Sequence, residues 1–87
     1  MNYRMWSLGY LSGKAVIQVV LRGVSSDVFL ADDANFRRFT RGESFNYYGG
    51  HYQGSPIRLS PPSSGHWNAV VVPKGGSVEA SVQVLAA

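Results

Sequence analysis

The stretch from residue 37 to residue 58 holds most of the side chains that could bind a polar or charged ligand. Arginine offers forked N–H donors to phosphate or carboxylate, and tyrosine adds a stacking face and a hydroxyl. A site for an anionic or sugar-like ligand can be built from these groups. The candidate ligand- or partner-binding residues are Arg37, Arg38, Arg41, Tyr47, Tyr48, His51, Tyr52 and Arg58.

Two interpretations of this stretch remain open. In the first, the arginines form a solvated helix face, while Tyr47 or Tyr48 alternates into the core. In the second, the stretch binds a protein partner or a small anionic ligand. Proteins that bind single-stranded nucleic acid also combine arginine with tyrosine, but usually with a larger positive excess than the net charge of +3. We therefore do not expect nucleic acid to be the partner.

The remaining ionisable residues form no recognisable catalytic motif. Asp32 and Asp33 suit the capping of a helix better than acid–base chemistry, and no other carboxylate pair is close in sequence. His51 and His66, without a thiolate or a spaced carboxylate, are poor evidence for a zinc site or a general base. Gly-x-Ser-x-Gly, P-loop and dinucleotide-binding patterns are missing from the sequence. We expect no enzyme activity, no metal and no cofactor.

Length and composition indicate one globular domain over residues 1–87, because 45% of the residues are apolar. The sequence has no cysteine, which excludes disulfides and thiolate chemistry. The first residues lack the apolar run of a secretory signal, and no run approaches the ~18 apolar residues of a membrane helix. We expect a cytoplasmic protein that does not contact a membrane.

A strand around Trp67 is the element on which the other elements should be organised. Prolines and a Ser-Ser-Gly turn precede it, and a run of β-branched residues follows at once. With a period of two, Trp67, Ala69 and Val71 share one face. The other face carries His66, Asn68, Val70 and Val72. We predict a central strand that is apolar on both faces toward its end, with Trp67 as a structural core residue.

Further strands are predicted at residues 3–11, 14–22, 27–31, 43–48, 56–60 and 77–85. Gly9 should form a bend or bulge, and Gly49-Gly50 should be a structural break that ends the 43–48 strand. Residues 51–55 should form a loop, and residues 74–77 a hairpin turn. Glu79 is the only charged residue between 77 and 87, so pairing of this edge, or of the 3–11 strand, across a two-fold axis would give a homodimer.

One short helix is predicted at about residues 33–41. Asp32 or Asp33 should cap its N-terminus, and Gly42 should end it. Phe36 and Phe39 form a short apolar stripe, and the three arginines cannot all be buried on so short a helix. The predicted fold is an all-β protein: an antiparallel β-sandwich of six to seven short strands with this one helix.

Several sequence segments together resemble an uncharacterised bacterial family of small domains of unknown function. The resemblance is carried by Leu8-Gly9-Tyr10-Leu11, Tyr47-Tyr48-Gly49-Gly50, Ser55-Pro56-Ile57-Arg58-Leu59, Pro62-x-Ser64-Gly65-His66-Trp67 and Ser81-Val82-Gln83-Val84-Leu85. It implies a compact β-sandwich, usually a stand-alone protein and sometimes joined to a TIR domain. It implies no established activity.

These observations favour a non-catalytic binding or protein-interaction module of unknown partner that self-associates. The alternative is a sensor for a small anionic ligand. The link to TIR domains favours a nucleotide-derived ligand for such a sensor, in bacterial immunity or signalling.

Overall fold

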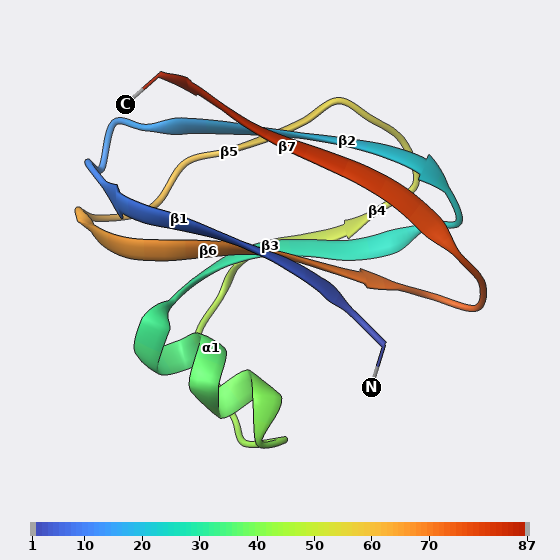
Figure 1. Cartoon of the computed structure of the whole chain (residues 1–87), viewed down its shortest axis with the longest axis horizontal. Coiled ribbons are helices and arrows are strands. Elements are labelled where there is room, and N and C mark those ends of the chain that lie inside the picture. Colours follow the sequence, from blue (N-terminus) through green and yellow to red (C-terminus); the bar gives the residue numbers. More distant parts are fainter. Residues whose placement is uncertain (1, 87) are drawn as a thin grey trace.

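A computed structural model describes residues 2–86, and in this range seven strands form two antiparallel sheets (Figure 1). The four-stranded sheet has the order β1 (Arg4–Leu11), β6 (Gly65–Pro73), β3 (Ser26–Asp32), β4 (Tyr48–Tyr52). The three-stranded sheet has the order β5 (Ile57–Leu59), β2 (Val16–Gly23), β7 (Val78–Ala86). The two sheets pack face to face, which confirms the predicted β-sandwich.

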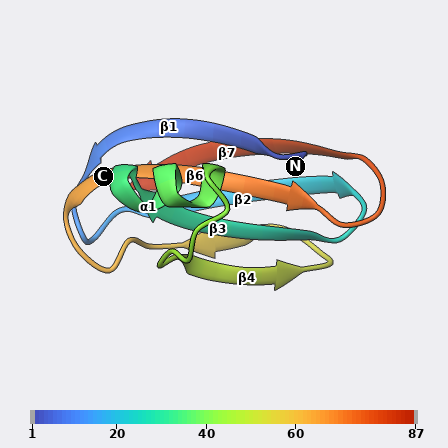
Figure 2. The same ribbon diagram turned by 90° about the horizontal axis from the view of Figure 1, so that it is seen from below.

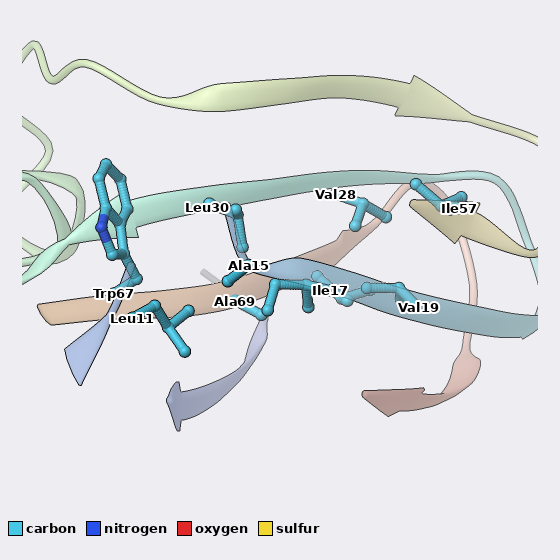
Figure 3. Close-up of a cluster of buried hydrophobic side chains, with 10 residues drawn as sticks. Leu11, Ala15, Ile17, Val19, Val28, Leu30, Ile57, Trp67 and Ala69 are labelled. Atoms are coloured by element: carbon cyan, nitrogen blue, oxygen red, sulfur yellow. The ribbon is translucent and has the colours of Figure 1, made fainter. Parts of the chain in front are cut away.

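The main core fills the space between the two sheets. Trp67 of β6 is 4% exposed and lies at one end of this cluster, together with Leu11 (Figure 3). The Trp67 Nε1–H donates to the Ser63 carbonyl at 3.0 Å, so the polar atom of the ring is satisfied. Ile17 and Val19 of β2, both fully buried, come from the opposite sheet.

A second apolar cluster lies on the outer face of the four-stranded sheet. There the helix α1 (Asp33–Thr40) covers β3 and β6, as the view from below shows (Figure 2). Phe39 packs against Phe29 of β3 and Val70 of β6. The two central strands are therefore apolar on both faces, as the sequence predicts for the end of the Trp67 strand.

The ends of α1 follow the predicted capping signals. The Asp32 carboxylate accepts a hydrogen bond from the backbone N–H of Asn35 at 2.8 Å, as an N-cap residue does. Gly42 has a φ of +73° just beyond the C-cap, a conformation that costs glycine little. The predicted bulge is also present, because the pairing of β1 with β6 shifts register between Ser7 and Gly9.

The strand predicted at residues 43–48 is wrong. Residues 43–47 have no regular structure, and β4 instead runs from Tyr48 to Tyr52, through the glycine pair and into the predicted loop. A Cβ atom at Gly49 would lie 2.6 Å from the Cα atom of Phe29, so β4 can approach β3 because position 49 is glycine. At Gly49 the glycine permits strand pairing and does not end the strand.

The hairpin predicted at residues 74–77 is also wrong, although the chain does turn there. This turn joins β6 of one sheet to β7 of the other, so the flanking strands do not pair with each other. Its backbone pairs instead with the neighbouring turn, since the N–H of Lys74 donates to the Ser25 carbonyl and the N–H of Val24 to the Ser77 carbonyl. Glycines specify that the chain reverses there, but they do not specify which strands pair.

Candidate functional site

The eight predicted binding residues do not gather at one place. Side chains alternate along β4, so His51 lies on the outer face of the four-stranded sheet, opposite Asp27 of β3. Tyr48 and Tyr52 face the other way: the Tyr48 ring lies 5.8 Å from the Trp67 ring, and Tyr52 packs on the main core. Arg58 belongs to β5 of the other sheet.

A groove of about 450 Å³ opens on the outer face of the four-stranded sheet, beside α1. We call it the aromatic groove. Its aromatic lining consists of Phe29, Phe39, Phe45 and Tyr47, and its remaining lining of Asp27, Gly50, His51, Val72 and Lys74. Two predicted residues, Tyr47 and His51, therefore belong to the same cavity.

The aromatic rings form a continuous wall. The ring centroid of Phe29 lies 5.6 Å from that of Phe45 and 5.4 Å from that of Tyr47, and Phe45 and Tyr47 are 5.3 Å apart. Phe29 is 5% exposed, whereas Tyr47 is 52% exposed. The groove thus has a buried apolar floor at Phe29 and an accessible wall at Tyr47. A planar or apolar group can pack against such a surface without a large rearrangement.

The irregular segment 43–47 carries Phe45 and Tyr47, and hydrogen bonds from the start of α1 hold it in place. The side-chain amide oxygen of Asn35 accepts a hydrogen bond from the backbone N–H of Asn46 at 2.8 Å. The Asn35 amide N–H in turn donates to the Asp32 carboxylate at 3.0 Å. The residue that caps α1 therefore also positions the segment that forms one wall of the groove.

A polar trio of Asp27, His51 and Lys74 lies at the rim of the groove, centred on Asp27. One carboxylate oxygen of Asp27 lies 2.9 Å from Nδ1 of His51, and the other lies 3.0 Å from Nζ of Lys74. Burial alone would raise the pKa of Asp27, but the hydrogen bonds and charges of His51 and Lys74 together lower it. Asp27 is therefore a carboxylate at neutral pH and holds both side chains at the rim.

A second, more open hollow of about 510 Å³ adjoins the aromatic groove, and the two share Phe45. Arg38 lines this hollow together with Asn35 and Asn46. Arg37, Arg38 and Arg41 are all exposed. Arg41 lies 3.8 Å from the Glu43 carboxylate, whereas no carboxylate among residues 2–86 lies within ion-pair distance of Arg37 or Arg38.

The sequence prediction missed several residues of the groove. The sequence does indicate where Phe29 lies, because this residue alternates with the inward-facing Val28 and Leu30 and must therefore lie on the outer face of the sheet. No sequence pattern indicates that Asp27 and Lys74 belong to the groove, since they meet only where the turn after β6 packs against the start of β3. The sequence pattern places Phe45 in a strand that does not form.

Two further observations concern metal binding and membrane spans in the described residues. No group of three His, Asp or Glu side chains within residues 2–86 is arranged to hold a metal ion. Within the same range, α1 is far too short and polar for a membrane span, and it is the only helix.

The fold and the groove define a small antiparallel β-sandwich whose outer face carries a cavity flanked by a helix. The chain belongs to the family described as "Domain of unknown function (DUF1883)", whose family model matches residues 1–87. A search of curated proteins and a search of solved structures both find no match. The predicted membership of a family of unknown function is thereby confirmed, and it assigns no activity.

Proposed function

We propose that this domain is a non-catalytic protein-interaction module that binds an acidic partner segment through an apolar anchor. The aromatic groove receives the anchor, which is one aromatic or large aliphatic side chain of the partner. Acidic residues beside the anchor contact Arg38 in the adjoining hollow, and the exposed Arg37 adds positive charge on the same helix. The observation that carries this proposal is the continuity of the two hollows through Phe45.

The composition of the two hollows supports this division of roles. Partly exposed aromatic side chains are frequent anchors of protein interfaces, because they bury a large area at low entropic cost. Arginines with no ion-pair partner within residues 2–86 are available to an incoming carboxylate. The charge at the groove rim is already largely compensated, since Asp27 accepts from Lys74 and His51. The acidic residues of the partner therefore belong at the helix and not at this rim.

The test is a selection from a library of displayed random peptides, with affinities then measured by fluorescence anisotropy. We expect enrichment of peptides with one aromatic or large aliphatic residue flanked by Asp or Glu. Tyr47→Ala should weaken their binding by about tenfold or more, as loss of an anchor contact does. Arg38→Gln should weaken it less and reduce its dependence on salt.

Matched controls come from the same chain. Tyr10→Ala removes a tyrosine that is 65% exposed on β1, and Arg58→Gln removes an arginine from the other sheet. Neither change should alter peptide affinity. The proposal fails if the library yields no enriched peptide, or if enriched peptides bind the Tyr47→Ala variant as tightly as the parent.

A second candidate function is a sensor for a small anionic ligand. The observation that favours it is the size of the aromatic groove, about 450 Å³, which suits a small molecule, with Lys74 and His51 at its rim. A nucleotide or cyclic nucleotide that raises the melting temperature more than NaCl of equal ionic strength would support this candidate. Lys74→Gln should then abolish the shift.

The resemblance described above also supports a proposal about the cellular setting. We propose that the domain works in the bacterial cytoplasm, alone or joined to a TIR domain. In the second arrangement, a nucleotide-derived ligand would fit the second candidate function best.

A further inference from the structure

The exposed edge of β7 is the least protected strand edge of the sandwich. Within the described residues 2–86, β7 pairs with β2 on one side only, and its other side presents backbone N–H and C=O groups that no other strand of this range pairs with. It is nine residues long, and Glu79 is its only charged residue. Val84 and Leu85 are 39% and 44% exposed along it. Folded proteins usually block such an edge, because it can pair with another chain.

The other three edges carry features that hinder pairing. β1 is interrupted by its bulge between Ser7 and Gly9, which twists an edge out of regular register. β4 has only five residues, two of them glycine. β5 has only three residues and is flanked by Pro56 and Pro61. The contrast within one molecule indicates that the β7 edge is kept open for a partner strand.

No helix or further strand among residues 2–86 covers this edge. α1 lies on the outer face of the four-stranded sheet, on the far side of the molecule from the sheet that contains β7 (Figure 1). In the view from below, β7 runs on the same side of the sandwich as β1, away from β4 (Figure 2). A second domain can therefore approach this edge without meeting the aromatic groove.

We infer that β7 pairs antiparallel with β7 of a second copy of this chain, so that two three-stranded sheets join into one. With the two-fold axis at Val82, this residue meets its own counterpart, and Ala80 meets Val84. All these side chains lie on the face of the sheet that is turned toward the main core, since Ile17, Val19 and Leu21 are their partners on β2. Apolar side chains thus meet apolar side chains in both halves of the pair.

The side chains on the outer face of β7 can also lie opposite those of a second copy without a clash of charge. There Ser81 meets Gln83 of the second copy, and Glu79 meets Leu85, so no like charges oppose each other. Glu79 is also neighbour to Arg22 across β2. A second copy fits this edge because the strand is complementary to itself about Val82, and two-fold contacts of this kind close without further growth.

Sedimentation equilibrium of the 87-residue chain, from micromolar to millimolar concentration, tests the inference. We expect a mass that rises with concentration from 9.5 kDa toward twice that value. The double variant Ser81→Lys with Gln83→Lys places lysines opposite each other across the two-fold and should raise the dimer Kd by about tenfold or more. The double variant Ser81→Glu with Gln83→Glu should do the same. An equimolar mixture of the two variants should form a heterodimer.

Ser81 and Gln83 are exposed, so both variants should keep the parental melting temperature and circular dichroism spectrum. The matched control is Gln53→Lys with Ser60→Lys, which adds the same charges at exposed positions away from β7 and should leave the dimer intact. A parent that stays at 9.5 kDa at millimolar concentration would overturn the inference. So would a dimer that persists in the Lys variant, or a mixture that does not associate. None of these readouts depends on peptide binding at the aromatic groove.

Discussion

At the scale of single residues, Trp67 makes a large contribution to the stability of the main core. Its ring is buried between the sheets and its N–H is hydrogen-bonded, so truncation removes both apolar burial and a satisfied donor. Trp67→Ala should lower the free energy of unfolding by about 3–5 kcal/mol, a large part of the total for a small domain. Urea denaturation followed by circular dichroism measures this loss.

The neighbouring His66 provides the control for this prediction. Its side chain is exposed on the opposite face of β6, and its ring lies 5.8 Å from the exposed Tyr10 ring, measured between ring centroids. His66→Ala should change the free energy of unfolding by about 0.5 kcal/mol or less. Equal losses for the two substitutions would contradict the assignment of Trp67 to the core.

Asp27 should give the protein a small acid sensitivity. Because its folded-state pKa lies below the ordinary value of about 3.9, its contribution to stability is complete above that value and is lost as the pH falls toward the folded pKa. The side chain is about one-third exposed, and solvent screening keeps the contribution to about 1 kcal/mol or less. Urea denaturation measures this at a series of pH values from about 6 down to about 3, roughly the range in which carboxyl groups titrate. The difference in unfolding free energy between the parent and Asp27→Asn should shrink as the pH falls.

NMR titration of the Asp27 carboxyl carbon tests the cause directly. The midpoint should lie below about 3.9 in the parent and should rise in Lys74→Gln, which removes one of the two partners. A midpoint at or above the ordinary value in the parent would show that burial outweighs the interactions with His51 and Lys74.

At the scale of elements, the pairing of β3 with β4 depends on the absence of a side chain at Gly49. Gly49→Ala should cost about 1–3 kcal/mol, because the new methyl group would press on the backbone of Val28 and Phe29, which cannot rotate away. Gly50→Ala is the adjacent control. Its new methyl group would lie 4.0 Å from the Tyr52 ring, an ordinary contact. We expect thermal denaturation to show a loss only for position 49, and equal effects at both positions would refute this account.

Elements with a strong local signal were predictable from the sequence, and the others were not. The limits of α1 follow from Asp32 and Gly42, and the two faces of β6 follow from alternation around Trp67. The position of β4 does not follow, because a glycine pair indicates a break unless the neighbouring backbone is known. The aromatic groove was predicted only in part, since Asp27, His51 and Lys74 come from three segments that only the tertiary fold brings together.

The sandwich separates two surfaces at the scale of the whole molecule. The aromatic groove and the arginines of α1 lie on the outer face of one sheet, whereas the open edge of β7 belongs to the other sheet. Two domains joined through β7 would therefore present two grooves at once. A partner with two acidic segments would then bind more tightly than a partner with one, without any new contact, provided its linker spans the distance.

The turn after β6, which connects the two sheets, has a consequence for how the chain reaches this structure. Among residues 2–86, β3 and β4 are the only consecutive strands that pair, and α1 lies between them. The other pairings join strands that are far apart in the sequence, such as Arg4 of β1 with Val71 of β6 and Val16 of β2 with Ala86 of β7. Most pairings must therefore close a long loop before any strand contact compensates for the lost chain entropy. Folding of such a topology is slow for its size, on the order of milliseconds to seconds. During that interval the apolar residues of β6 and β7 are accessible to other chains, so the yield of native protein should fall as the concentration during refolding rises.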